Sequence, residues 1–255
     1  MLLLLDIGNT SATYGIYKKG RISLFGNTLK DGIPKFVYKY IKNGRQCSIN
    51  IVYCSVVPQI SLDLRKSVKE NKDCRLWEVG RNLPLKIKGR YRDPRTLGID
   101  RKVKIFGALR LYRPPFLVLD FGTAITVDFV SRKGVFEGGM IIPGPELAFN
   151  TLIKRAALIP KNIRLPEKAP SFLGRSTHDC LASGILEGYG AMIDGLIDRF
   201  RSRYGKGLQV IATGGFASDI KAYSRKLTIG DPQHSIKSLA ILFNEFCLQR
   251  RLGSI

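Results

Sequence analysis

The chain contains two versions of one segment, and this internal repeat constrains the possible fold more than any other feature. Residues 2–22 (LLLLDIGNTSATYGIYKKGRI) and residues 116–136 (FLVLDFGTAITVDFVSRKGVF) align without a gap on Asp6 and Asp120. Each copy predicts a buried apolar strand, an Asp-x-Gly turn, a second strand, a basic hairpin that ends in glycine and the start of a third strand. Two such copies predict two lobes of similar construction.

The lobes are expected to share the 255 residues almost equally, because the second copy begins near the midpoint. We predict an N-terminal lobe of residues 1–114 and a C-terminal lobe of residues 115–255, with the boundary at Pro114-Pro115. Hydrophobic residues make up 44% and charged residues 24% of the chain, a balance typical of a globular protein rather than a disordered one.

Helices and strands are expected in both halves, which gives an α/β protein. The sequence predicts helices over residues 34–41, 61–70, 101–111 and 176–203, and strands over residues 51–57, 116–120 and 209–213. Gly184 and Gly188 lie one turn apart in the longest helix, where each costs up to about 1 kcal/mol of helix propensity relative to alanine. We therefore expect another backbone to pack close to that helix.

The Asp-x-Gly turns allow two interpretations. A single such turn after a strand is usually only a tight turn. Two turns in register favour a phosphate site, because glycine lets backbone N–H groups approach phosphate oxygens and a carboxylate can reach a cation directly or through water. One carboxylate in each half of the chain predicts two lobes that face a shared cleft.

The sequence shows no sign of export, membrane insertion or a zinc site. The apolar run at residues 2–5 is too short for a signal peptide, and no apolar stretch approaches the roughly 20 residues of a membrane span. His178 and His234 have no partners at zinc-ligand spacing. Five scattered cysteines, odd in number, predict reduced thiols in a cytoplasmic protein. They are Cys47, Cys54, Cys74, Cys180 and Cys247.

The chain is strongly basic, with 42 Lys and Arg against 20 Asp and Glu and a formal net charge of +22. The basic residues are spread along the whole chain, and no known nucleic-acid-binding motif accompanies them. We therefore expect a solvated basic surface on an enzyme with polyanionic substrates, and only non-specific electrostatic binding to nucleic acid.

Seven short motifs occur along the chain in a characteristic order. They are DIGNT (residues 6–10), SVVP (55–58), GIDR (98–101), DFGTAIT (120–126), GGMIIPG (138–144), GRST (174–177) and TGG (213–215). TGG alone is unspecific, whereas DIGNT, GIDR and DFGTA together are specific. With these motifs the sequence closely resembles the type III pantothenate kinases over nearly its whole length.

The resemblance implies two ribonuclease-H-like lobes of the acetate and sugar kinase, Hsp70 and actin superfamily, with ATP between them. It implies transfer of the γ-phosphoryl group of ATP to the terminal hydroxyl of pantothenate, the first step of coenzyme A biosynthesis. It also implies Mg²⁺ with ATP, a monovalent cation such as K⁺ or NH₄⁺, and a homodimer.

The resemblance further implies roles for individual residues. Asp100 would be the general base, Asp120 would bind the monovalent cation, and Asp6 could contact Mg-ATP. The expected ATP-binding residues are Asp6, Ile7, Gly8, Asn9, Thr10, Ser11, Ala12, Thr13 and Thr123. The expected pantothenate-binding residues are Tyr91, Gly98, Ile99, Asp100, Arg101 and Thr177.

Several of these residues have structural alternatives. Asp100 and Thr177 each stand at the start of a predicted helix, where either could serve as the N-cap. Tyr91 could be a loop aromatic packed on the core. For the whole chain, the alternative is a family member that acts as a nucleic-acid-associated or transcription accessory factor. Its weakness is that Asp6, Asp100 and Asp120 would have no task in a binding module and would locally repel DNA.

Overall fold

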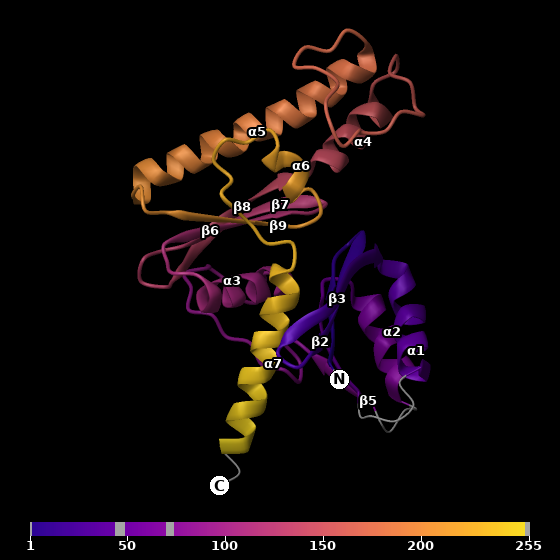
Figure 1. The fold of residues 1–255 in the computed structure, drawn as a ribbon, viewed down its shortest axis with the longest axis vertical. Coiled ribbons are helices and arrows are strands. Elements are labelled where there is room, and N and C mark those ends of the chain that lie inside the picture. Colours follow the sequence, from indigo (N-terminus) through magenta and orange to yellow (C-terminus); the bar gives the residue numbers. More distant parts are fainter. Residues whose placement is uncertain (1, 44–48, 70–73, 253–255) are drawn as a thin grey trace. The chain divides into compact units, whose positions relative to one another are not determined.

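The computed structural model describes residues 2–43, 49–69 and 74–252 (Figure 1). The chain divides into two compact units, Met1–Leu111 with Gln233–Ile255 and Tyr112–Pro232, here called the first and second unit. The expected C-terminal lobe of residues 115–255 differs from this division. Residues 233–252 belong to the first unit because helix α7 (His234–Leu252) packs on the sheet and on a helix of that unit.

The first unit is built on a five-stranded mixed sheet of order β3-β2-β1-β4-β5. Strand β1 pairs antiparallel with β2 and parallel with β4, β2 pairs antiparallel with β3, and β4 pairs parallel with β5. The strands are β1 (Leu2–Ile7), β2 (Ser11–Lys18), β3 (Arg21–Leu29), β4 (Ile49–Ser55) and β5 (Cys74–Glu78). The helices are η1 (Lys30–Gly32), α1 (Ile33–Asn43), α2 (Pro58–Lys69), α3 (Ile99–Leu111) and α7.

The leucine run of β1 is buried on both faces of the sheet, because successive strand residues point to opposite sides. Leu3 and Leu5 pack in a core with α1 and α2. Leu2 and Leu4 pack in a second core with α3 and α7. Helices α3 and α7 approach so closely that a Cβ on Gly107 would lie 1.7 Å from the Oγ of Ser238.

The second unit repeats this topology, with a sheet of order β10-β9-β6-β7-β8. Its strands are β6 (Phe116–Phe121), β7 (Ala124–Val130), β8 (Phe136–Pro143), β9 (Gln209–Thr213) and β10 (Ile229–Gly230). Its helices are α4 (Pro145–Arg155), α5 (Thr177–Tyr204) and α6 (Ala217–Lys221). The internal repeat therefore does correspond to two similar sheets. Their hairpins differ by one residue in register, because Asp6 lies opposite Thr13 whereas Asp120 lies opposite Thr126.

Most predicted elements are confirmed, with shifts at their ends. Helix α2 begins at Pro58 rather than at residue 61, because proline is well suited to the first turn of a helix. Residues 234–252, for which no element was predicted, form α7.

The expectation of close backbone packing at Gly184 and Gly188 is wrong for the isolated chain. Nothing lies within 4 Å of a Cβ built on either residue, whereas a Cβ on Gly190 would lie 2.3 Å from the carbonyl oxygen of Tyr223. Contrary to the expectation that no stretch could span a membrane, helix α5 is long and apolar enough to do so by length and composition. Core helices of soluble proteins pass the same test, and α5 places Leu186, Ile193 and Ile197 in the core of its unit.

Candidate functional site

The first Asp-x-Gly turn joins β1 to β2 and is closed by a hydrogen bond from the Gly8 N–H to the Ser11 carbonyl oxygen at 2.9 Å. Ile7 and Ala12 are buried in the core, so only their backbones can meet a ligand. Asn9, Thr10 and Ser11 are exposed. The turn therefore offers hydroxyl and amide groups beside Asp6, which is 9% exposed at the end of β1.

Asp6 belongs to a buried charged cluster. The Lys104 ammonium lies 3.4 Å from Oδ2 of Asp6 and 3.8 Å from Oδ2 of Asp100. On β4, the Cys54 thiol donates to Oδ1 of Asp6 at 3.2 Å. Burial above all, and then the charge of Asp6, raises the pKa of Cys54 well above its usual value, so the thiol stays protonated. The structure thus brings the first turn and the proposed base together around one ammonium.

Lys104 was not identified from the sequence, because one lysine among 42 basic residues is not distinctive. Its spacing from Asp100 does carry a signal. Residues four apart on a helix lie on the same face, so an Asp–Lys pair at that spacing in α3 predicts a contact. What the spacing could not show is the third member, Asp6, which comes from the sheet.

The structure decides both capping alternatives. Gly98 precedes the first residue of α3, so Asp100 is the second helical residue and not the N-cap. An acid in this first turn still interacts favourably with the helix dipole. At α5 the N-cap is Ser176, whose side chain accepts from the Asp179 N–H at 3.1 Å. Thr177 is the exposed residue that follows the cap.

The remaining predicted substrate residues of the first unit lie near α3. Arg101 is 6% exposed, and its guanidinium carbon is 5.9 Å from the centre of the Tyr91 ring, a cation–π distance. Tyr91 is half-buried, which fits both a role in binding and a loop aromatic packed on the core. Ile99 contacts the turn at Gly80, where a Cβ would lie 3.3 Å from its Cδ1. Tyr91 and Arg101 form a paired aromatic and cationic surface next to Asp100.

The second Asp-x-Gly turn is packed against two other glycine turns. Gly214 has a φ of +93°, and a Cβ there would lie 2.7 Å from Oδ1 of Asp120. The Gly144 N–H donates to the Thr123 carbonyl oxygen at 2.9 Å. Asp120 and Thr123 are therefore held together with the GGMIIPG and TGG motifs within the second unit.

Thr126 adds an oxygen beside Asp120. The two residues are directly opposite across β6 and β7, so their side chains share one face of the sheet. Thr126 is 8% exposed, and among the described residues no hydrogen-bond partner reaches its Oγ1. A carboxylate and a buried hydroxyl oxygen on one face are suitable ligands for a hard cation.

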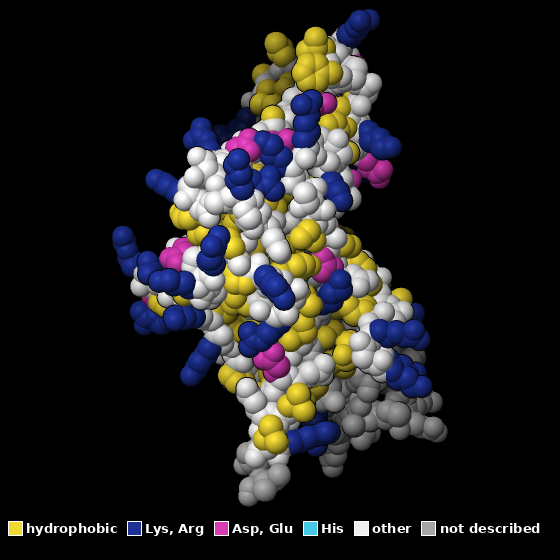
Figure 2. All heavy atoms as spheres, turned by 60° about the vertical axis from the view of Figure 1, so that its left-hand side comes forward, with side chains coloured by type: hydrophobic (Ala, Val, Ile, Leu, Met, Phe, Trp, Pro, Cys, Tyr) yellow, Lys and Arg dark blue, Asp and Glu magenta, His cyan; other side chains and the backbone are white. Residues whose placement is uncertain are grey.

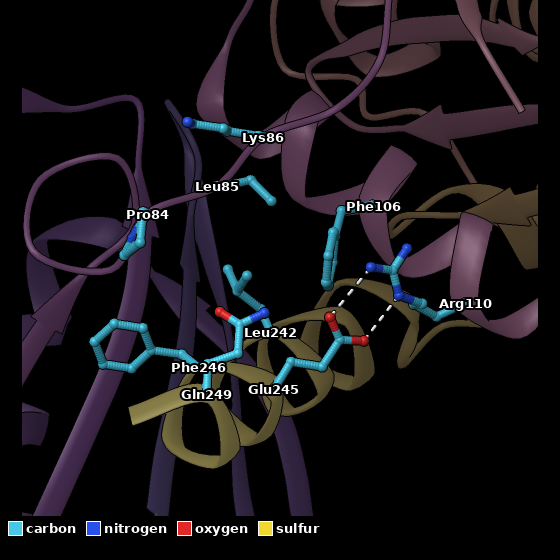
Figure 3. Close-up of a pocket in the computed structure, with 9 residues that line it drawn as sticks. All are labelled: Pro84, Leu85, Lys86, Phe106, Arg110, Leu242, Glu245, Phe246 and Gln249. Carbon is cyan, nitrogen blue, oxygen red and sulfur yellow. Dashed lines mark hydrogen bonds and ion pairs between the residues drawn. The ribbon is translucent and has the colours of Figure 1, made fainter. Parts of the chain in front are cut away.

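A separate hollow of about 370 Å³ lies in the first unit between residues 84–86, α3 and α7 (Figure 3). Arg110 lines one side of it and donates to both carboxylate oxygens of Glu245, at 2.8 and 3.1 Å. None of the predicted site residues lines this hollow. It is thus distinct from the cluster around Asp6 and Asp100.

The described residues hold no group of three or more His, Cys, Asp and Glu that could bind a metal. The four described cysteines are free thiols, and Cys47 lies outside the described residues. On the face drawn in Figure 2, the Lys and Arg side chains are scattered and form no single patch.

Comparison with solved structures supports the fold class. A Sinorhizobium meliloti protein named as a 2-dehydro-3-deoxygalactonokinase aligns with a TM-score of 0.63 and 13% identity, over 96% of each chain. A Campylobacter jejuni protein named for a Baf family of transcriptional activators aligns with a TM-score of 0.58 and 21% identity, over 95% of this chain and 98% of that one. At these identities the likeness shows only that the fold is shared.

Sequence comparison identifies the family. The family model for type III pantothenate kinase matches residues 2–199. The type III pantothenate kinase of Rubrobacter xylanophilus is 30% identical over 263 aligned positions, which cover 95% of this chain and 97% of the relative. Together with the two repeated sheets and their Asp-x-Gly turns, these matches show that the chain belongs to the type III pantothenate kinase family.

Proposed function

We propose that Asp100 accepts the proton of the pantothenate hydroxyl while the turn at Asp6 holds the phosphates of ATP. Membership of the family makes the chain a pantothenate kinase that uses Mg-ATP. The residue assignment is supported above all by the two contacts of the Lys104 ammonium, with Asp6 and with Asp100. They show that the turn proposed to bind phosphate and the proposed base lie close together. Phosphoryl transfer needs this convergence, since its catalysis consists mainly of positioning and electrostatic stabilisation.

The Asp6 turn suits the nucleotide. Asn9, Thr10 and Ser11 are exposed and meet the phosphates, and Thr13 is held by its hydroxyl, which donates to Oδ1 of Asn27 at 2.8 Å. Asp6 would reach the magnesium of Mg-ATP directly or through water. One protein carboxylate is sufficient for this, because Mg²⁺ in such sites is bound largely by substrate phosphates and water. When bound, the ion neutralises charge that develops on the transferring group.

Arg101, Tyr91 and Thr177 bind pantothenate in this proposal, together with the backbone at Gly98 and Ile99. Buried Arg101 presents a planar fork of donors that matches a carboxylate such as that of pantothenate. The Tyr91 ring next to it limits the directions in which the guanidinium can point. The test is ATP turnover by the wild-type protein with one alcohol at a time. ADP release that depends on pantothenate and not on a sugar supports the proposal, and release with sugars alone would contradict it.

A monovalent cation is proposed at Asp120. The carboxylate ends a buried strand, and Oγ1 of Thr126 lies on the same face with no hydrogen-bond partner among the described residues. A K⁺ or NH₄⁺ ion bound there would take oxygen ligands from the Asp120 carboxylate and from the buried Thr126 hydroxyl, which would gain a partner. The ion would also supply positive charge beside the Thr123 turn, where the nucleotide is proposed to bind.

Replacing K⁺ and NH₄⁺ by a bulky organic cation is expected to abolish most of the activity. The charge of such an ion cannot come close to both the Asp120 carboxylate and the Thr126 hydroxyl. The measurement is steady-state turnover at constant ionic strength. Asp120→Ala should remove the dependence on K⁺ together with most of the activity. An Asp120→Ala variant that keeps wild-type turnover and its response to K⁺ would contradict the site.

We further propose a homodimer in the cytoplasm. Helix α5 has open space over Gly184, Gly188 and Gly195, where glycine allows a second helix to approach closely. Large apolar side chains are also exposed in the loop before α5: Leu158 at 97%, Phe172 at 74% and Leu173 at 74%. A second copy of the chain would cover both features about a two-fold axis.

Gly184→Arg is expected to convert the dimer to a monomer, because the long side chain prevents close approach while the open space leaves the single chain unstrained. Sedimentation at micromolar concentration measures the mass, which should fall from twice to once 28.5 kDa. Gly207→Arg is the control, since that glycine also has open space but lies in a loop after the helix. A wild-type protein that sediments as one chain with full activity would refute the dimer.

A further inference from the structure

Lys104 is a buried lysine between two acids that the reaction uses for different purposes. It is 6% exposed, and its neighbours Val103, Ile105 and Phe106 on α3 are buried apolar residues. Its ammonium contacts Asp6 on the sheet and Asp100 one helical turn away on its own helix. No task was assigned to Lys104 by the motifs in the sequence.

Stability is a weak reason for an ammonium at this position. A buried ion pair loses hydration that its Coulomb energy only partly returns, and an apolar side chain of similar volume often stabilises a core as well. The surrounding positions of α3 already show that the core accepts apolar side chains here. A function for the charge explains its presence better.

The Lys104 ammonium contacts two carboxylates, those of Asp6 and Asp100. On β4, the Cys54 thiol is neutral because burial raises its pKa, and it donates to the other oxygen of Asp6. On α7, ring nitrogen Nε2 of His234 lies 2.8 Å from the carbonyl oxygen of Lys104 and so contacts the backbone of that residue. One positive charge thus stands between two negative ones.

The geometry connects the sheet to the base. Asp6 is fixed by its strand, which pairs on both sides with β2 and β4, and by the Cys54 thiol. Asp100 is less constrained, because its side chain is 24% exposed and it lies in the first turn of its helix. Lys104 therefore links the less constrained carboxylate of Asp100 to the fixed carboxylate of Asp6. Its positive charge also offsets the repulsion between the two carboxylates.

We propose that Lys104 is a positioning residue of the phosphoryl transfer, which holds the Asp100 carboxylate in the orientation needed to take the proton of the substrate hydroxyl. This inference rests on the proposed role of Asp100. It assigns Lys104 no contact with substrate: its effect on turnover passes through Asp100. Small displacements of a catalytic group suffice to slow a reaction strongly, so the loss of the ammonium has a large kinetic effect.

The first experiment replaces Lys104 by methionine, which keeps the stem and removes the charge. We expect kcat to fall by about 10–100-fold while KM for pantothenate changes by no more than about threefold, because the groups proposed to bind pantothenate stay in place. Lys104→Arg should recover part of kcat, since it restores a cation. Lys102→Met makes the same change on the same helix without a contact to either acid and should keep wild-type kcat. If Lys104→Met does not fold by circular dichroism, Lys104→Gln takes its place and is judged by the same values.

The second experiment combines Lys104→Met with Asp100→Asn. If Lys104 acts through Asp100, the double variant is about as slow as Asp100→Asn alone. Losses that multiply would show that Lys104 acts by another route and would overturn the inference. Normal kcat in Lys104→Met would overturn it while leaving the role of Asp100 intact. Normal kcat in Asp100→Asn would instead reject the proposed base itself, so the two failures are distinguishable.

Discussion

Replacing Asp100 by asparagine is expected to lower turnover by about 10²–10⁴-fold, the range that positioned proton transfer contributes. An alkanol does not ionise by itself at neutral pH, and in a loose transition state the forming bond makes its proton acidic late in the reaction. A carboxylate can then accept this proton, whereas an amide of the same shape cannot.

The fold should tolerate this change. Asp100 is not the N-cap of α3, and its distance of 3.8 Å from the Lys104 ammonium is that of a long, partly exposed ion pair. We therefore expect the melting temperature to stay within a few degrees of wild type. Asp63→Asn on α2 is the matched control, because it removes an acid of the same unit that lies outside the proposed site. Near-normal turnover in Asp100→Asn would contradict the proposal that Asp100 is the general base.

Replacing Gly214 by alanine is expected to destabilise the second unit by about 2–4 kcal/mol, the combined cost of a strained backbone and an overpacked site. The residue has a φ of +93°, and a Cβ would lie 2.6 Å from the backbone N and O of Phe121 and 2.7 Å from Oδ1 of Asp120. The backbone atoms of Phe121 cannot move away without disturbing the hydrogen bonds of strand β6 to its neighbours. The same change should weaken the response to K⁺, since it displaces Asp120.

The neighbouring glycine provides the control for this prediction. Nothing lies within 4 Å of a Cβ on Gly215, so Gly215→Ala should keep wild-type stability. Scanning calorimetry is the suitable measurement, because two units can unfold in separate transitions. If Gly214→Ala and Gly215→Ala both have the melting temperature of wild type, the TGG turn does not approach Asp120 as closely as described.

The two sheets were predictable because the repeat encodes them in local patterns. Four consecutive leucines before an Asp-x-Gly turn predict a strand buried on both faces, and β1 is such a strand. The family resemblance added the superfamily and the reaction. It could not add the register of each hairpin, which differs by one residue between Asp6 and Asp120 although the sequences align without a gap.

Helix α7 could not be assigned to the first unit from the sequence, because its position depends on contacts distant along the chain. Ile236 and Leu239 have apolar spacing that would suit a helix in either lobe. The small pair Gly107 and Ser238, 131 positions apart, permits its close packing on α3. Lys104 was missed for a related reason: helical spacing links it to Asp100, but only the folded sheet adds Asp6.

The most direct test of the account is detection of the phosphorylated product by mass spectrometry. The purified protein is mixed with pantothenate, Mg-ATP and K⁺, and in parallel Asp100→Asn and Asp63→Asn are treated in the same way. We predict 4′-phosphopantothenate with wild type and Asp63→Asn, and about 10²–10⁴-fold slower formation with Asp100→Asn. Absence of 4′-phosphopantothenate from the wild-type mixture, with the protein folded and ATP intact, would contradict the account.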